Sequence, residues 1–248
     1  MAQYSTFVFA GHGGNPYDCG AYSNGKEEHL IAEKIALKVR DYLLDAGITV
    51  QYGEDNYRKN LTQNNSYSMH YGISIHLNAG GGTGAEAIVP MRESYCVTEQ
   101  HILNDLAKLG LKNRGVKSRD YNTEKWHQRT NGVKLSGSDY YGEIRNAWGN
   151  ASLTILEIGF IDNPDDLKII ENNIPQISHI IASRMAEIIN KQISPLKVEN
   201  PPMSQSDAKK GYYRVICGSF SDKNNALARK EALIKSGFKE VFLEFKEK

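Results

Sequence analysis

Two histidines and one glutamate have the side chains and the local settings of a hydrolytic metal site. His12 lies in a glycine-flanked turn, Glu28 opens a long amphipathic segment, and His76 ends an alternating apolar run. Two imidazoles and one carboxylate are a common zinc ligand set, which leaves the fourth position to water. Because the three residues are far apart in the sequence, their spacing alone also allows a turn histidine, an acid favoured by the helix dipole and a core histidine.

Glu157 is a candidate proton carrier for the same site. It follows Leu153, Ile155 and Leu156 in the apolar run SLTILEI, where an ionisable group is costly unless it has partners. A buried acid at the end of a strand is a functional candidate for that reason. The alternative is a structural acid that bonds to a neighbouring lysine or to the backbone.

Hydrophobic periodicity predicts the elements that must bring these residues together. The expected strands cover residues 7–10, 48–52, 72–78, 85–90 and 152–158, and the expected helices cover 27–46, 98–111, a short segment capped at 163–166, and 174–193. This alternation predicts an α/β fold with a mostly parallel sheet covered on both faces. Candidate site residues then lie near the carboxyl ends of strands, where sites in open α/β sheets form.

Two segments are not predicted to form helices or strands. Residues 113–146 are rich in Arg, Lys, Tyr and Gly and have weak periodicity, so they are interpreted as a long loop, and its basic aromatic part at 119–138 is expected to shape a groove. The glycine run at 80–84 either lines that groove or forms a flexible turn.

Composition limits the partners and the compartment. Of 248 residues, 30 are Lys or Arg and 29 are Asp or Glu, and the net charge of +1 gives no electrostatic case for nucleic acid or for an anionic membrane surface. The three cysteines have no CxxC spacing, which argues against a disulfide framework and a thiolate zinc site. The sequence has no apolar stretch long enough to span a bilayer and no recognisable secretory signal, so we expect synthesis in the cytoplasm without a signal peptide.

The C-terminal quarter has a different character. Residues 195–210 are rich in Pro, Ser, Gln and Lys and are interpreted as a linker. The predicted organisation is therefore a catalytic domain over 1–194, this linker, and a small α+β unit over 211–248 with a strand, a helix at 224–236 and a second strand.

Four motifs occur in an order that resembles a known family. GHGG, the acid that opens the next helix, SIHLNA and LEIGFIDNPDD are similar to the motifs of zinc-dependent N-acetylmuramoyl-L-alanine amidases of the amidase 3 group. The resemblance covers residues 5–193 and includes the catalytic domains of bacterial autolysins and phage endolysins. It implies a mostly parallel six-stranded sheet flanked by helices, and Zn²⁺ as the cofactor.

The resemblance also assigns roles to the candidate residues. His12, Glu28 and His76 match the zinc ligands, and Glu157 matches the catalytic acid. Glu28 is favoured over the adjacent Glu27 because the family's ligand lies seven positions before an Ile-Ala pair of its helix.

Two further expectations concern the surroundings of these residues. Asn78 is a candidate substrate-binding residue, with a strand-end hydrogen bond as the alternative. The family often has Asp-Pro where this chain has Phe9-Ala10, which is expected to remove a supporting acid near His12.

The implied reaction is hydrolysis of the amide between N-acetylmuramic acid and L-alanine of the peptidoglycan stem peptide. Zinc-activated water would attack, and Glu157 would act first as base and then as acid. The expected setting is a phage endolysin, otherwise a bacterial autolysin, that reaches the wall after release through a holin or by cell lysis. The alternatives are a non-catalytic wall-binding protein and a zinc carboxypeptidase acting on the stem peptide.

The C-terminal unit resembles half of a second module. Tyr213-x-Val215-x-x-Gly-Ser-Phe220, followed by Asn225-Ala226 and Gly237-Phe238, is similar to the first half of a SPOR repeat, a peptidoglycan-binding module. Since a complete module needs a second half, binding of glycan would require two chains, which implies a homodimer formed through this unit. The alternative is a degenerate remnant.

Overall fold

The computed structural model describes residues 6–12, 18–53, 71–145, 152–196 and 223–235. The chain divides into two compact units, Met1–Lys197 and Val198–Lys248. The second unit contributes one described helix, α7 (Lys223–Lys235), which agrees with the helix expected at 224–236. The strands expected on either side of it lie outside the described residues, and the wall-binding role of this unit remains a prediction.

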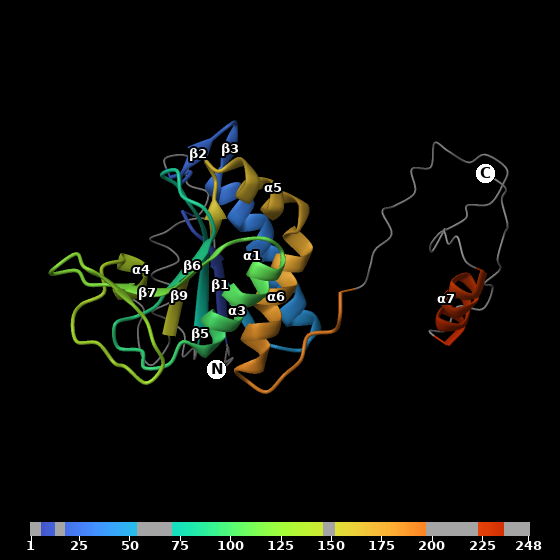
Figure 1. Ribbon diagram of the computed structural model, residues 1–248. Coiled ribbons are helices and arrows are strands. Elements are labelled where there is room, and N and C mark those ends of the chain that lie inside the picture. The colour runs from blue at the N-terminus through green and yellow to red at the C-terminus, as the bar shows by residue number, and fades with distance from the viewer. Residues whose placement is uncertain (1–5, 13–17, 54–70, 146–151, 197–222, 236–248) are drawn as a thin grey trace. The chain divides into compact units, whose positions relative to one another are not determined.

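The first unit is built on a mixed sheet (Figure 1). Its strands are β1 (Thr6–Ala10), β4 (Val50–Tyr52), β5 (Tyr71–Asn78), β6 (Ala85–Ile88), β7 (Asn113–Arg119), β8 (Trp126–Gln128) and β9 (Ser152–Phe160). Their order is β4-β1-β5-β9-β6-β7-β8, and every neighbouring pair is parallel except β9–β6 and β7–β8. The α/β class and the mostly parallel sheet are confirmed, but the sheet has seven strands rather than six.

The two strands that hydrophobic periodicity did not predict, β7 and β8, come from the segment that was expected to be a long loop. In β7 the buried Val116 and Ser118 alternate with Lys117 and Arg119, which are only partly buried. One of the two inward residues is polar and both outward ones are charged, so the strand lacks an alternating apolar signal. Charged side chains are common near the edge of a sheet. The segment therefore extends the sheet, and β8 returns antiparallel to β7.

Three long helices cover one face of the sheet (Figure 1). They are α1 (Glu28–Asp45), α3 (Val97–Lys108) and α6 (Ile174–Glu187), and α6 packs against both of the others. Their apolar stripes and the inward residues of β1 and β5 form the main core. α6 ends before the expected residue 193, and Asn190 beyond it adopts a left-handed φ of 55° that a continuing helix does not allow.

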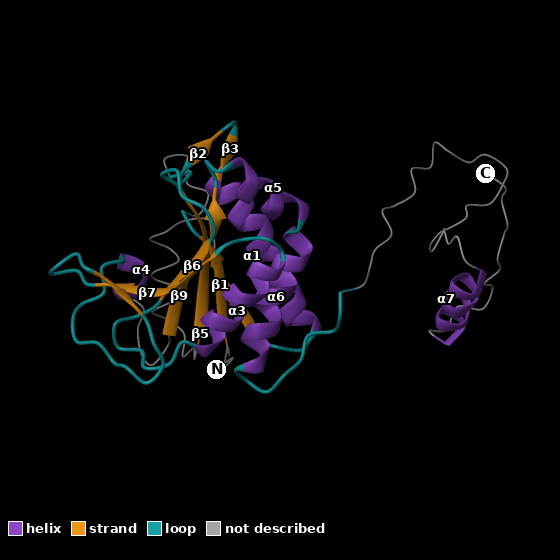
Figure 2. Cartoon of the chain, viewed as in Figure 1, coloured by secondary structure: helices purple, strands orange, loops and turns teal. Residues whose placement is uncertain are grey.

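The opposite face carries the short helix α4 (Gly142–Arg145), which lies on the other side of the sheet from α1, α3 and α6 (Figure 2). Its Ile144 packs on Ile88 and Ile155, which are register partners in β6 and β9. Residues two positions apart in a strand share a face, so Glu86 and Glu157 lie on this face, beyond the apolar contact. The helices therefore cover the two faces of the sheet unequally, because among the described residues α4 is the helix that lies on this face.

Candidate functional site

His12, Glu28 and His76 converge where β1 and β5 end. One potential ligand atom from each lies within 4.8 Å of the others. Glu28 Oε1 is 3.1 Å from His76 Nδ1 and 3.3 Å from His12 Nε2. Parallel pairing of β1 with β5 brings the two histidines to the same edge of the sheet, and their rings meet edge to face at 5.0 Å.

The position of His12 depends on its glycine neighbour and on an acid. A Cβ at Gly11 would lie 2.1 Å from the His76 ring, so only glycine allows this approach of the two segments. His12 itself has a left-handed φ of 63°, and its Nδ1 is 2.8 Å from Asp18 Oδ1. Asp18 thus supports His12, although Phe9-Ala10 replace the Asp-Pro that the family often has upstream.

Glu28 is fixed by backbone donors at the start of α1. Its Oε1 accepts from Leu77 N at 3.0 Å, and its Oε2 accepts from Ala21 N at 2.8 Å. Burial acts to raise the pKa of Glu28, but the hydrogen bonds and charges of His12 and His76 outweigh burial and hold that pKa well below its usual range. Glu27 lies outside the cluster, with its side chain 37% exposed and 3.5 Å from His29.

His76 is buried and has a second acid beside it. Its Nε2 is 3.0 Å from Ser74 Oγ and 3.6 Å from Glu143 Oε2 on α4. Burial acts to lower the pKa of His76, but the negative charge of Glu143 and the hydrogen bond to Glu28 raise it well above its usual range. Glu143 was not among the residues expected to form the site, because it lies in a weakly periodic segment and only the fold brings it to His76.

Glu157 lies across from His76 in the sheet. The register pairs His76 with Glu157 and Glu157 with Glu86, which sets the three side chains in a row on one face. Burial raises the pKa of Glu157 to about 7; the positive charge of His76 opposes this, and the carboxylates of Glu28 and Glu86 add to it. Among the described residues, its buried Oε2 has no hydrogen-bond partner. Such a carboxyl group exchanges a proton readily at neutral pH.

The three-residue cluster fits a divalent zinc ion by its donors and its packing. Hydrogen bonds from outer groups are what normally orient metal-binding imidazoles and carboxylates, and Asp18 and the Ala21 N–H do this here. A Cβ at Gly20 would lie 2.6 Å from both Glu28 Oε2 and the His12 ring, so the cluster is closely enclosed on that side. The set of donors is that of an open zinc site in a hydrolase.

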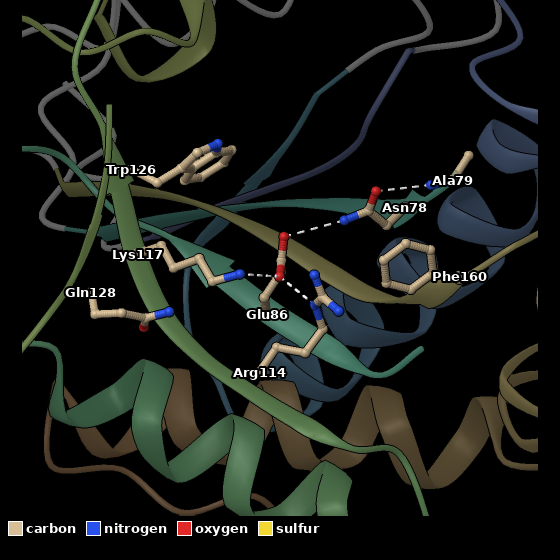
Figure 3. Close-up of a pocket in the computed structure, with 8 residues that line it drawn as sticks. All are labelled: Asn78, Ala79, Glu86, Arg114, Lys117, Trp126, Gln128 and Phe160. Carbon is tan, nitrogen blue, oxygen red and sulfur yellow. Dashed lines mark hydrogen bonds and ion pairs between the residues drawn. The ribbon is translucent and has the colours of Figure 1, made fainter. Parts of the chain in front are cut away.

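A pocket of about 650 Å³ lies next to Glu157 on the same face (Figure 3). Its lining residues are Asn78, Ala79, Glu86, Arg114, Lys117, Trp126, Gln128 and Phe160. Asn78 donates from Nδ2 to Glu86 Oε1 at 3.2 Å, and its Oδ1 accepts from Ala79 N at 2.9 Å. Asn78 thus lies in the pocket wall and also makes the strand-end hydrogen bond that was the alternative, so its substrate-binding role remains a prediction.

Two aspartates that follow β9 hold the glycine run beside this pocket. Gly80 N and Gly81 N each donate to Asp162 Oδ2 at 2.8 Å, and Gly84 N donates to Asp166 Oδ2 at 2.7 Å. These bonds lower the pKa of Asp162 below its usual range. The run is therefore a loop tied to the start of α5 (Pro164–Asn172) rather than an untethered turn.

The fold and the site together define an α/β protein with a candidate hydrolytic metal site, and the comparisons with known proteins identify its family. The chain matches the N-acetylmuramoyl-L-alanine amidase family over residues 7–191 and belongs to that family. The matched range contains all the candidate site residues and ends before the C-terminal unit.

Individual relatives agree with this assignment. The chain is 28% identical over 232 residues to the N-acetylmuramoyl-L-alanine amidase CwlM of Bacillus licheniformis, a match that covers 89% of this chain and 77% of that protein. It is 27% identical to the endolysin of Bacillus phage SPP1, covering 73% of this chain and 64% of that one. An N-acetylmuramoyl-L-alanine amidase from Clostridium difficile 630 has the same fold, with a TM-score of 0.56 at 22% identity over 76% of this chain and 98% of that structure.

None of the described helices is long and apolar enough to cross a bilayer.

Proposed function

We propose that this amidase is zinc-dependent and that it cuts the amide between N-acetylmuramic acid and L-alanine with Glu157 as its proton carrier. The observation that carries the proposal is the convergence of His12, Glu28 and His76, with Glu157 opposite His76 in the adjacent strand. Membership of the amidase family supports the bond and the substrate, peptidoglycan.

In this proposal His12, His76 and Glu28 hold the metal. Zn²⁺ supplies Lewis acidity, which polarises the scissile carbonyl and makes water a better nucleophile at neutral pH. Asp18 keeps His12 Nε2 turned toward the site by binding Nδ1, and the Leu77 and Ala21 N–H groups hold the Glu28 carboxylate in place. The protein therefore supplies a ligand set whose orientation is fixed before substrate binds.

Glu157 performs the proton transfers. Its carboxylate takes a proton from the attacking water as the new C–O bond forms at the lactyl carbonyl carbon. It then delivers that proton to the amine nitrogen of L-alanine as the C–N bond breaks. A pKa of about 7 suits both steps, because the group exists in both forms near neutral pH.

Digestion of purified cell walls tests the reaction and the metal together. We expect new L-alanine amino termini, loss of that activity on chelation, and recovery when zinc is returned. New reducing sugar ends without new amino termini would contradict the amidase assignment, and release of C-terminal amino acids alone would favour a carboxypeptidase. Absence of any product from zinc-loaded protein would favour a non-catalytic wall-binding role.

The biological setting that we propose is that of a phage endolysin, with a bacterial autolysin as the second candidate. Similarity to a protein named endolysin supports the first. In either setting the protein would be made in the cytoplasm and would reach the wall after release through a holin or by cell lysis. The unit at 211–248 would bind peptidoglycan or join two chains into a homodimer.

A further inference from the structure

The pocket beside Glu157 has an excess of positive charge. Arg114 Nε and Lys117 Nζ both contact the same oxygen of Glu86, at 2.5 and 2.6 Å, while the other oxygen of Glu86 accepts from Asn78 (Figure 3). Two cations therefore face one carboxylate. A ligand that brings its own negative charge would complete the set, whereas a neutral ligand would not.

Arg114 is held in place but keeps hydrogen-bonding capacity. Its Nε is bound to Glu86, its Nη1 donates to Thr83 O at 3.3 Å, and its guanidinium lies over the Phe160 ring at 4.9 Å from the centroid. Among the residues that the structure describes, Nη2 makes no hydrogen bond. Because a guanidinium carries five N–H donors in a rigid plane, the remaining edge suits a carboxylate.

The opposite wall of the pocket is aromatic. Trp126 is 46% exposed, and Lys117 Nζ and the Arg119 guanidinium lie 5.8 and 5.3 Å from its ring centroid. Cations over the indole face hold the ring in position and leave a broad apolar surface open to solvent. The pocket thus offers a positively charged end for an acid and a flat side for an aliphatic chain.

The distance from the catalytic residue fits a short peptide. Glu157 on β9 is separated from Arg114 and Lys117 on β7 by the single strand β6. Neighbouring strands lie about 4.8 Å apart, so the β7 backbone stands roughly 10 Å from β9, and Arg114 and Lys117 reach back from β7 to the Glu86 carboxylate on β6. An extended peptide advances about 3.5 Å per residue, so a pocket that spans β6 and β7 accepts groups one to three residues from the scissile bond.

We propose that this pocket is the stem-peptide subsite and that Arg114 and Lys117 bind a free carboxylate of the peptide there. The inference rests on the proposed function, which puts the scissile amide at Glu157. The second residue of the stem is a glutamate joined through its side chain, so its α-carboxyl group is either a free carboxylate or a carboxamide. The N-acetylated sugars of the glycan are neutral and would leave the positive charge uncompensated. The subsite therefore selects substrates by the form of that group.

A pair of soluble substrates tests the selection. The two are N-acetylmuramoyl-L-alanyl-γ-D-glutamyl peptides that differ only in having the α-carboxylate or the α-carboxamide. For the wild-type protein we expect kcat/KM to be about tenfold higher for the carboxylate, mainly through KM, as is usual for a charge-assisted hydrogen bond. Equal kcat/KM values for the two substrates would overturn the inference.

Variants locate the effect. Arg114→Gln and Lys117→Gln should each reduce the preference severalfold, and Arg114→Lys should keep part of it because the charge remains. Lys38→Gln is the matched control, since Lys38 is an exposed cation on α1, which covers the other face of the sheet. Preference that survives in both Gln variants would overturn the assignment to these residues, and thermal unfolding shows that each variant is folded.

Binding without turnover separates this inference from the proposed function. The product dipeptide L-alanyl-D-glutamate, with its γ-carboxyl group blocked as the methylamide, is titrated in its α-carboxylate and α-carboxamide forms while the indole N–H signal of Trp126 is followed by NMR and assigned with Trp126→Phe. Preferential binding of the carboxylate form by a protein that cuts no wall would support the subsite and refute the proposed function. Wall cleavage with equal binding of both forms would support the proposed function and refute the subsite. A response of Trp126 to a glycan fragment alone would assign the pocket to sugar.

Discussion

The residues around Glu157 set its pKa. Burial and the nearby Glu28 and Glu86 carboxylates raise its pKa to about 7, whereas Glu28, which faces two imidazoles and two backbone donors, stays ionised. Two identical side chains thereby differ in protonation, which suits the roles that we propose for them, one to hold a metal and the other to carry a proton.

Replacing the acid should separate catalysis from metal binding. Glu157→Gln is expected to lower kcat by a factor of about 10² to 10⁴, the usual contribution of general acid–base catalysis, while zinc content stays at the wild-type level. Turnover of muramyl peptide and metal analysis of the same sample measure the two effects. A near-normal rate would mean that Glu157 is structural.

Adjacent glutamates offer a direct comparison of ligand and non-ligand. Glu28→Gln removes one charge from the buried cluster and should weaken zinc binding by at least tenfold, the scale found even for outer-sphere changes at metal sites. Glu27→Gln, one residue earlier and partly exposed, should leave affinity unchanged. Competition with a chromophoric chelator measures both, and equal losses in the two variants would contradict the assignment.

The raised pKa of Glu157 also predicts how stability depends on pH in the metal-free protein. Its folded pKa of about 7 lies above the unfolded value near 4.5, so the folded state holds the proton longer, and stability from this group is lost as pH rises through that window. Glu157→Gln should therefore raise the free energy of unfolding by about 3 kcal/mol at pH 8 and by little at pH 4. Urea unfolding at the two pH values checks this, and an equal change at both would refute it.

At the scale of elements, the pocket beside the site depends on the glycine run at 80–84, which is held by residues that follow β9. The buried Asp166 carboxylate accepts from Gly84 N, Phe160 N and the Thr83 hydroxyl, and so joins the glycine run to the start of α5. A Cβ at Gly84 would lie 2.1 Å from the Lys112 carbonyl oxygen, at a φ of 95°, so this crossing requires glycine. The pocket wall at Asn78 and Ala79 rests on these contacts.

Removal of that carboxylate should destabilise the whole unit. Asp166→Ala is expected to cost about 3 kcal/mol, because it leaves buried donors unpaired. Asp165→Ala is the matched control: its side chain is exposed in the first turn of the same helix, and its loss should cost about 0.5 kcal/mol through the helix dipole. Chemical denaturation measures both, and similar costs would show that the buried bonds do not matter.

At the scale of the whole molecule, the family covers one of two compact units. A chain ending at residue 197 should keep wild-type turnover of soluble muramyl peptide, because every candidate site residue lies before that point. The full chain is expected to sediment as a dimer and to bind intact walls more tightly, because the role that we propose for the unit at 211–248 is to bind peptidoglycan or join two chains. Analytical ultracentrifugation and wall co-sedimentation of the two proteins test this, and identical behaviour would favour a degenerate remnant.

Apolar periodicity and short motifs are local properties, so the fold class and the candidate site residues could be predicted from the sequence. His12, Glu28 and His76 lie together where β1 and β5 end, with Glu157 opposite His76, and their roles remain predictions. β7 and β8 could not be predicted as strands, because their polar and charged residues hide the alternating hydrophobic pattern.

What surrounds those residues depends on the tertiary structure. Asp18 lies beside His12, α4 brings Glu143 to His76, and strand register places Glu86 next to Glu157. The pKa of Glu157 and the charge of the adjacent pocket follow from those neighbours. Burial and electrostatic interaction depend on distance in space, and distance along the chain does not report it.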